Sequence, residues 1–273
     1  MANKLLSYIR TKTGEKHSTR NGAGGPFVKA NGLKHDAFFQ SIHQTFLFDW
    51  YMEIGCRSGA IFSQVRGKTV AVDPYFQVTR NVIGSKPALH LFQTKSDDFF
   101  ELGFLKKNAI AVSASFLDGM HLMEYLLRDF INAERNSHPN GVIAMHDCCP
   151  YDTLMTTRDL KNLPTGSWTG DVWKILPILQ KYRPDLKITV LNCAHTGLVV
   201  VSNLDPQNIV LAKNYEAILK SYLDVDLASY GVEKFFTSFE YIDAQSYLEK
   251  GAEDFALAAM DQTHELSPVF ITP

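Results

Sequence analysis

The stretch Tyr51-Met-Glu-Ile-Gly-Cys-Arg-Ser-Gly59, followed by Val72-Asp73-Pro74, decides the fold of this chain. Residues 46–54 are rich in aromatic and apolar side chains and predict a strand that ends at Gly55. Gly55 and Gly59 then bracket a tight turn, because glycine tolerates backbone conformations that other residues avoid.

The residues after this turn complete a β-α-β unit. Residues 60–66 predict the start of a helix, and residues 68–72 predict a second strand that ends at Asp73. Glycines at such a turn let a ligand lie against the backbone, and a carboxylate at the tip of the second strand can accept hydrogen bonds from ribose hydroxyls. The unit therefore predicts a nucleoside-binding site.

The spacing of the glycines distinguishes between ligand classes. The dinucleotide fingerprint G-x-G-x-x-G, counted from Gly55, places its second and third glycines at Arg57 and Ala60. The second glycine, which lets the backbone approach a pyrophosphate, is missing. A nicotinamide-dependent oxidoreductase is therefore disfavoured.

The pattern that is present, Glu53-x-Gly55-x-x-x-Gly59 followed by Asp73, resembles motif I of the class I S-adenosylmethionine-dependent methyltransferases. The resemblance implies that the glycine turn packs under the methionine part of the cofactor and that Asp73 holds the ribose. An acidic or hydroxyl residue after the third strand contacts the adenine in that family, which makes Ser96 and Asp97 candidates; a plain helix cap is the alternative. The implied cofactor-binding residues are Glu53, Gly55, Cys56, Arg57, Ser58, Gly59, Asp73, Ser96, Asp97 and Asp118.

Strand, helix and turn signals alternate along the whole middle of the chain. This alternation predicts an α/β protein with a doubly wound, mainly parallel sheet, and the family's fold implies seven strands with a reversed last strand. The further expected elements are helix 35–45, helix 75–85, strand 87–92, a helix from residue 96, buried strand 108–117, helix 122–133, an Asn140-Gly141 turn, strand 142–145, helix 171–182 and a hairpin of strands 187–191 and 198–202.

Three regions differ in composition. Residues 1–45 form a basic arm and a helix; the first 34 residues hold seven basic side chains against one acid. Residues 46–205 make up the expected cofactor-binding domain, and residues 206–273 a helical extension that could pack on the sheet, cover the substrate or form a homo-oligomer contact. The connection 150–170 is long for a structural link, and such loops often carry function.

Bulk composition limits the partners. The net charge is −2, and the charge as a whole argues against nucleic acid as the main partner. The four cysteines lack the spacing of a disulfide scaffold or a C-x-x-C site. The sequence shows no apolar run of membrane-spanning length and no signal-peptide core, so a cytoplasmic protein without membrane contact is expected.

Polar residues stand at the predicted ends of neighbouring strands. Asp118 ends the fourth strand and Asp147 the fifth, and His121 and His146 accompany them. Because the carboxyl ends of parallel strands share one edge of a sheet, these side chains should converge beside the cofactor. Two carboxylates with an imidazole can hold Mg²⁺, and an imidazole titrates near neutral pH, which suits a general base.

The motif Asp118-x-x-His121, with an acidic residue at the next strand end, looks like the metal-dependent sugar O-methyltransferases of macrolide pathways. The resemblance implies His121 as general base, with Asp118 as a catalytic residue and metal ligand, and Asp147 as a second ligand. His146 stands where those enzymes carry a carboxylate, so the expected metal set is Asp118, His146 and Asp147, with Mg²⁺ or another divalent ion.

The resulting expectation is an enzyme that moves a methyl group from S-adenosylmethionine to a hydroxyl oxygen of a small molecule. A sugar or polyol is the first choice of acceptor and a catechol-like phenol the second. A non-catalytic module that binds S-adenosylmethionine or a nucleotide is the alternative of a different class.

Overall fold

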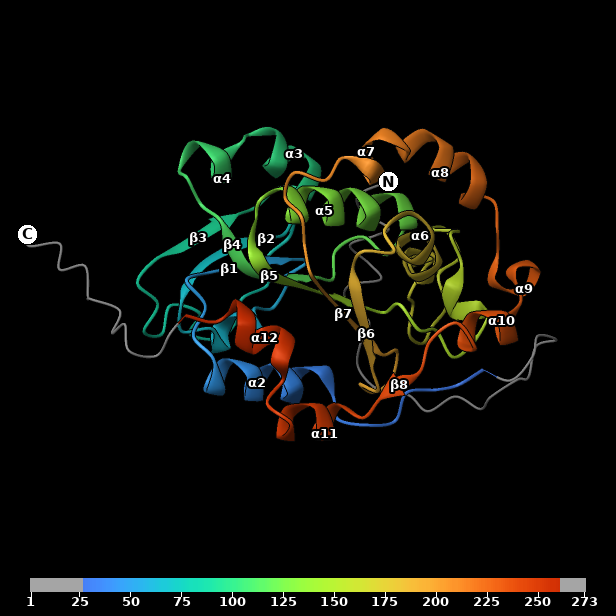
Figure 1. The fold of residues 1–273 in the computed structure, drawn as a ribbon, viewed down its shortest axis with the longest axis horizontal. Helices are drawn as coiled ribbons and strands as arrows, with labels where there is room; N and C mark the ends of the chain where they lie inside the picture. Colours follow the sequence, from blue (N-terminus) through green and yellow to red (C-terminus); the bar gives the residue numbers. More distant parts are fainter. Residues whose placement is uncertain (1–26, 261–273) are drawn as a thin grey trace, which may run out of the picture.

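The computed structural model describes residues 27–260, which form one sheet covered by helices on both faces (Figure 1). The sheet has eight strands in the order β3-β2-β1-β4-β5-β7-β6-β8. The strands are β1 Trp50–Ile54, β2 Lys68–Val72, β3 Leu89–Phe92, β4 Val112–Leu117, β5 Ser137–His146, β6 Lys187–Leu191, β7 Leu198–Ser202 and β8 Tyr241–Ile242.

The α-helices differ in length from one turn to more than three. They are α2 His35–Thr45, α3 Ser96–Glu101, α4 Phe104–Lys107, α5 Met123–Arg135, α6 Ile175–Tyr182, α7 Val210–Lys213, α8 Tyr215–Tyr222, α9 Leu227–Tyr230, α10 Val232–Phe236, α11 Ala244–Glu249 and α12 Glu253–Ala258. Three short 3₁₀ helices, η1 Phe62–Gln64, η2 Leu154–Thr156 and η3 Val172–Lys174, lie in connections. Among the helices of residues 27–260, none has both the length and the apolar character to cross a bilayer.

The sheet is the doubly wound, mainly parallel one that the sequence predicted. Strands β3, β2, β1, β4 and β5 run parallel, and β7 lies antiparallel between β5 and β6. The prediction of a reversed last strand among the first seven is confirmed. An eighth strand, β8, extends the sheet by a two-residue parallel pairing with β6 that no sequence pattern indicated.

Alternate residues of each central strand enter different cores, as the two-residue period of a strand requires. In β1, Met52 and Ile54 face the core beneath α5, whereas Tyr51 faces the core beneath α2. Every residue of β4 is buried, because both faces of this central strand are covered by helices.

The C-terminal segment packs on the sheet rather than standing apart from it. In Figure 1, α11 and α12 lie with α2 on the face of the sheet opposite α5. The ring of Phe255 in α12 is 5.8 Å from Phe38 in α2 and 6.4 Å from Phe48. Of the basic arm that the sequence predicted, residues 1–26 lie outside the described residues.

Two expected helices are wrong or shortened. Residues 75–85 contain no helix, and residues 60–66 contain only η1. The segment after β2 is instead tied to the glycine turn, because the Gln77 amide donates to the Arg57 carbonyl at 2.7 Å and Val82 packs against Gly59. Backbone groups that bond to a neighbouring turn are not free to close helical hydrogen bonds, so the tertiary contact overrides the local pattern.

Strand boundaries also differ from the prediction. The first strand begins at Trp50 rather than at residue 46, and β5 begins at Ser137, ahead of Asn140-Gly141. The pairing of β4 with β5 shifts register between Val112 and Ala114, so the expected turn is an irregularity within the strand. Such bulges accommodate the extra residues without ending the strand.

Candidate active site

The glycine turn lies directly against the end of β4. Gly55 has a positive φ of 86°, and a Cβ atom placed on it would be 2.0 Å from the backbone oxygen of Asp118. Gly59 also has a positive φ, of 75°. Only glycine allows the turn to adopt this backbone and to lie so close to Asp118. The turn that follows β1 and the polar end of β4 are therefore in direct contact.

Asp73 organises the turn through its carboxylate. Its Oδ2 accepts a hydrogen bond from the Arg57 amide at 2.8 Å, and its Oδ1 accepts one from the Tyr75 amide at 2.6 Å. An ionised carboxylate offers about four acceptor positions. Asp73 is thus fixed in place at the tip of β2 with acceptor capacity left for a ligand.

The other residues expected at the turn have distinct surroundings. Cys56 is buried, and its thiol donates to the Glu53 carbonyl at 3.1 Å, whereas Ser58 is partly exposed. Glu53 is buried and accepts a hydrogen bond from the Tyr51 hydroxyl at 2.8 Å. Burial, together with the negative charges of Asp118 and Asp73, raises the pKa of Glu53 to about 8, although the Tyr51 hydrogen bond opposes this shift.

Ser96 and Asp97 stand at the start of α3, beside α5. Both carboxylate oxygens of Asp97 accept hydrogen bonds from the Arg128 guanidinium at 2.7 Å, and Ser96 is hydrogen-bonded to the buried Asp129. Neither side chain caps the helix, so the alternative of a plain helix cap does not hold. Sequence reasoning missed Arg128 and Asp129, since both lie within an ordinary helical pattern.

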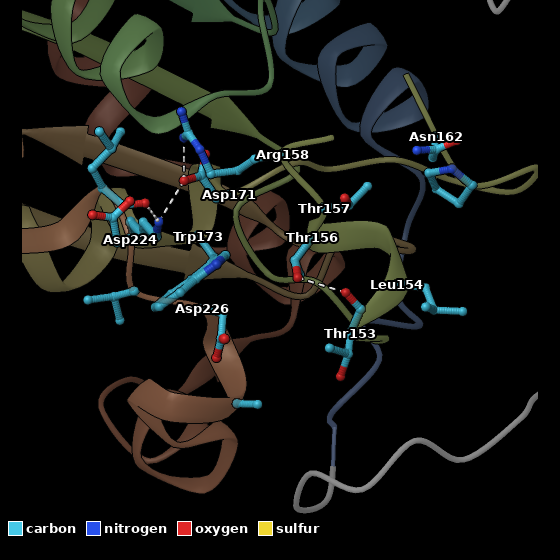
Figure 2. Close-up of a pocket in the computed structure, with 15 residues that line it drawn as sticks. Thr153, Leu154, Thr156, Thr157, Arg158, Asn162, Asp171, Trp173, Asp224 and Asp226 are labelled. Atoms are coloured by element: carbon cyan, nitrogen blue, oxygen red, sulfur yellow. Dashed lines mark hydrogen bonds and ion pairs between the residues drawn. The ribbon is translucent and has the colours of Figure 1, made fainter. Parts of the chain in front are cut away.

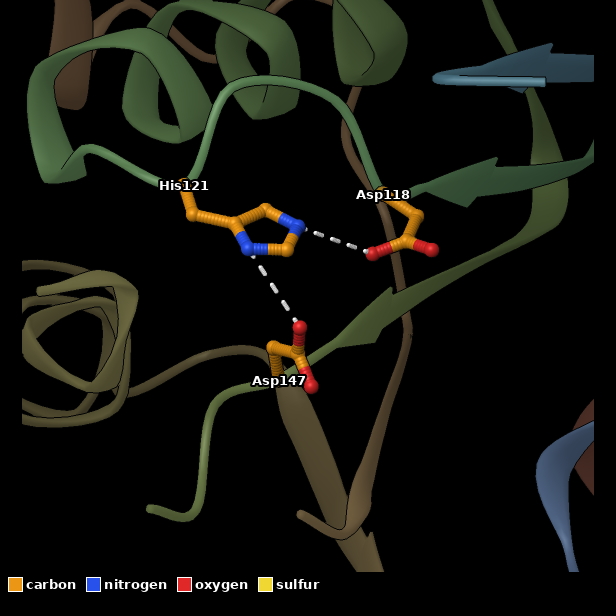
Figure 3. A group of neighbouring side chains, drawn as sticks. All are labelled: Asp118, His121 and Asp147. Carbon is orange, nitrogen blue, oxygen red and sulfur yellow. Dashed lines mark hydrogen bonds and ion pairs between the residues drawn. The ribbon is translucent and has the colours of Figure 1, made fainter. Parts of the chain in front are cut away.

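Asp118, His121 and Asp147 converge at the carboxyl edge of the sheet. Figure 3 shows the His121 ring between the two carboxylates, which follow β4 and β5. His121 Nε2 lies 3.3 Å from Asp118 Oδ1, and His121 Nδ1 lies 3.4 Å from Asp147 Oδ2. Asp147 adopts a left-handed backbone with φ 60°, a region that Asp tolerates better than most residues.

The neighbouring charges in this cluster shift the pKa values of His121 and Asp118 in opposite directions. Burial alone would lower the pKa of His121, but the hydrogen bond to Asp118 and the charges of Asp147 and Asp118 raise it to about 9. Burial alone would raise the pKa of Asp118, but His146 and His121 together lower it below its usual range. At neutral pH the cluster therefore holds an imidazolium between carboxylates.

The connection 150–170 orients the His121 ring. The Trp168 carbonyl lies 2.8 Å from His121 Nδ1, and the two rings are 5.2 Å apart. A hydrogen bond from Nδ1–H to this carbonyl leaves Nε2, which faces Asp118, as the nitrogen that can give up its proton and accept another. Gly170 is required for the backbone of this connection to lie close to His121, because a Cβ atom at position 170 would be 1.6 Å from the His121 carbonyl oxygen.

His146 contacts both carboxylates of the cluster. Its Nδ1 lies 3.4 Å from both Asp118 Oδ1 and Asp147 Oδ1, and its ring is 4.1 Å from that of His35 in α2. Its buried Nε2 has no hydrogen-bond partner within the described residues. Burial and His146 together lower the pKa of His35 to about 4, so this neighbour is neutral. Nothing in the sequence around His35 indicated its place here.

Three side chains of the cluster could hold a divalent ion. One ligand atom from each of Asp118, His121 and Asp147 lies within 4.8 Å of the others, the single such group of three found among residues 27–260. Two carboxylates and one imidazole suit Mg²⁺ or Mn²⁺. His146, which the sequence placed in the metal set, contacts both carboxylates without joining that group of three, so its part in metal binding stays a prediction. Asp147 is further fixed by the Thr196 hydroxyl, which donates to Oδ1 at 2.6 Å.

The sequence matches no protein-family model and no curated protein. By structure the chain is similar to the O-methyltransferase from Bacillus cereus in complex with SAH, with a TM-score of 0.46 at 12% identity, over 74% of this chain and 91% of that one. It is also similar to the methyltransferase MycE from the mycinamycin biosynthetic pathway, in complex with Mg, SAH and mycinamycin VI, with a TM-score of 0.42 at 12% identity over 64% of this chain.

The match covers only 49% of the MycE chain, so this chain spans about half of that protein. The O-methyltransferase TomG from Streptomyces achromogenes, involved in tomaymycin synthesis and in complex with SAM, matches with a TM-score of 0.38 at 14% identity, over 61% of this chain and 78% of that one. These similarities are distant, and none of them assigns a role to a residue of this chain.

Proposed function

We propose that this chain is an S-adenosylmethionine-dependent methyltransferase that transfers a methyl group to a hydroxyl oxygen of a small molecule. The main support for this proposal is a contact between two parts of the sheet's carboxyl edge. The turn at Gly55, with Asp73 at its side, touches the strand end that bears Asp118, so a nucleoside held by the turn would lie next to the His121 cluster. A cofactor site and a proton-accepting site are thereby contiguous.

The roles of the residues follow from their positions. Asp73 would accept hydrogen bonds from the ribose hydroxyls, and the backbone at Gly55 and Gly59 would lie under the methionine part. Methyl transfer is an in-line displacement at carbon, so the protein contributes by aligning the acceptor and removing its proton. His121 would take that proton at Nε2, the nitrogen that faces Asp118, because Nδ1–H donates to the Trp168 carbonyl.

Asp118 and Asp147, with His146 as the expected third ligand, would hold a divalent ion if one is used, and His121 would then stay available as the base. Such an ion would supply positive charge that lowers the pKa of an acceptor hydroxyl and orients two vicinal oxygens. His121 carries a proton at neutral pH in the arrangement described, and positive charge between the two carboxylates would remove the cause of its raised pKa.

A sugar or polyol is the acceptor that we infer first, and a catechol-like phenol second. A pair of carboxylates beside an imidazole matches neighbouring hydroxyls, which are donors, better than it matches an anionic or apolar acceptor. The long polar connection 150–170, which supplies the Trp168 carbonyl and ring, provides further hydrogen-bonding groups near the same place.

A calorimetric titration of S-adenosylhomocysteine tests the cofactor assignment. We expect binding to the wild-type protein and a loss of about tenfold or more in affinity for Asp73→Ala, because a charge-assisted hydrogen bond contributes about 1.5–3 kcal/mol. The titration is repeated with and without Mg²⁺, and Asp49→Ala, which removes a partly exposed acid just before β1, serves as control. A flat titration for the wild type would contradict the proposal.

A further inference from the structure

The polar cluster at the carboxyl edge is supported by two separate parts of the chain. On the His121 side, the connection 150–170 is fixed by ion pairs, and Figure 2 shows Asp171 beside Arg158, which donates to it at 2.6 Å. Asp171 also accepts a hydrogen bond at 2.8 Å from the amide of Met123, at the start of α5. His121 therefore has supports that do not involve the carboxylate at the end of β5.

Asp147 is supported instead by the β6–β7 connection, residues 192–197. The antiparallel pairing of β5 with β7 ends at His146 and Leu198, so the residues just beyond this pair lie close together. Thr196 is one of them: it is 4% exposed, and its hydroxyl donates to Asp147 Oδ1 at 2.6 Å. A hydrogen bond to an ionised carboxylate is stronger than one between neutral groups.

This hydrogen bond sets the direction in which the Asp147 carboxylate faces. While Oδ1 is held by the Thr196 hydroxyl, Oδ2 faces His121 Nδ1 at 3.4 Å. The backbone of Asp147 is left-handed, with φ 60°, a conformation that persists where neighbouring contacts hold it. Without the hydroxyl the carboxylate is free to turn, and it would no longer present the same oxygens to an ion.

The β6–β7 connection is itself anchored to the chain just before α2. The side chain of Asn192 accepts a hydrogen bond from the Asn31 amide at 2.8 Å and donates one to Asn31 Oδ1 at 3.1 Å. Gly32 lies so close that a Cβ atom on it would be 2.1 Å from the Asn192 carbonyl oxygen. One end of this short connection is thus held by the N-terminal part of the described chain, and the other end holds Asp147.

We propose that the β6–β7 connection positions Asp147 for a divalent ion, with Thr196 orienting the carboxylate and Asn192 anchoring the connection. Groups that hydrogen-bond to a metal-ligating carboxylate raise the affinity for the ion, and their loss typically weakens binding by about 10–100-fold. The inference rests on the proposed function for the purpose of the ion. Ion binding, however, is measured without cofactor or methyl transfer.

Mn²⁺ alone is the probe, because electron paramagnetic resonance detects the free ion directly. We expect the wild-type protein to bind Mn²⁺ and Asp147→Asn to lose this binding. Thr196→Val, which removes the hydroxyl and keeps a side chain of similar shape, should weaken binding by about 10–100-fold. Thr196→Ser keeps the hydroxyl, so its affinity should stay within about threefold of the wild type.

Thr69→Val is the matched control for the loss of a buried hydroxyl. Thr69 is fully buried near the amino end of β2, and its hydroxyl donates to the Gly67 carbonyl at 3.1 Å. This variant should bind Mn²⁺ as the wild type does. Urea denaturation of both valine variants separates a loss of ion affinity from a loss of folding.

Asn192→Ala tests whether the connection acts through Thr196. Alone, it should weaken Mn²⁺ binding by about threefold or more, an effect typical of residues that act on a site through others. Combined with Thr196→Val it should add little, because changes that act through one shared residue are not additive. Asn108→Ala, which removes an exposed side chain bonded to a backbone carbonyl just after α4, is the control and should have no effect.

The proposal would be overturned if Thr196→Val bound Mn²⁺ as the wild type does, or if Thr196→Ser bound it as weakly as Thr196→Val. An Asn192→Ala protein with unchanged affinity, fully additive losses in the double variant, or a wild-type protein that does not bind Mn²⁺ would also overturn it. The S-adenosylhomocysteine titration decides the proposed function separately. A protein that binds S-adenosylhomocysteine but not Mn²⁺ would keep the methyltransferase assignment and lose this role of the β6–β7 connection.

Discussion

The sheet has one edge formed by the amino ends of its parallel strands and another formed by their carboxyl ends, and these two edges carry buried charge in different ways. At the amino edge, Arg183 lies just after α6 and donates to Glu134 at 2.6 Å and to both oxygens of Asp185. The second oxygen of Glu134 accepts from the Asp205 amide at 3.1 Å. Each charged group has partners of opposite charge or a backbone donor, so this network is closed.

At the carboxyl edge the corresponding network is open. Asp118 and Asp147 are both negative and share His121, while the buried Nε2 of His146 has no partner in residues 27–260. The pKa of His121 is raised to about 9, and Asp147 adopts a left-handed backbone. Open charge, displaced pKa values and unusual backbone are together typical of a functional site, whereas a closed network is typical of a structural one.

The largest expected effect is on turnover, which should depend on the carboxyl edge and not on the amino edge. His121→Ala should lower kcat by about 10²–10⁴, the usual contribution of a positioned general base, with little change in affinity for S-adenosylhomocysteine. The histidine control is His138→Ala, an exposed residue in β5 at the amino edge, which should leave kcat unchanged. Turnover by His121→Ala within threefold of the wild type would remove His121 from the mechanism.

The next largest effect is on the free energy of unfolding, which should depend on the closed network at the amino edge. Arg183→Met leaves the buried Glu134 without its cation and should lower the free energy of unfolding by about 3–5 kcal/mol, measured by urea denaturation. Adding Glu134→Gln should restore most of this loss, because the buried charge is gone and the amide oxygen can still accept from Asp205. If the double variant is as unstable as Arg183→Met alone, charge is not the cause.

The same contrast explains what the sequence could reveal. Buried strands and their ends follow from apolar runs and turn residues, so β2, β6 and β7 have the bounds that the sequence predicted, and Asp118 and Asp147 fall at strand ends as expected. His121 follows because it is three residues from Asp118 along the chain. Each of these predictions depends on residues that are near one another along the chain, and such patterns can be recognised in a single sequence.

Contacts between distant segments could not be predicted in this way. His35, Trp168 and Thr196 reach the cluster from three separate parts of the chain, and no spacing relates them to Asp118 or Asp147. The missing helix at residues 75–85 has the same origin, because a hydrogen bond from Gln77 to Arg57 replaces the helical ones. Tertiary partners decide such cases, and propensity alone does not.

The smallest expected effect is a pH dependence that belongs to the open edge alone. The pKa of His121 rises from 6.5 to about 9 on folding, so its interactions with the carboxylates stabilise the protein fully below about pH 6.5 and are lost as the pH rises through 9. The difference in free energy of unfolding between wild type and His121→Gln should therefore fall across this window, by at most about 3 kcal/mol. His138→Gln, a change at an exposed histidine in β5, is measured alongside as the control. A difference that grows with pH would mean that the carboxylates do not stabilise an imidazolium at this position.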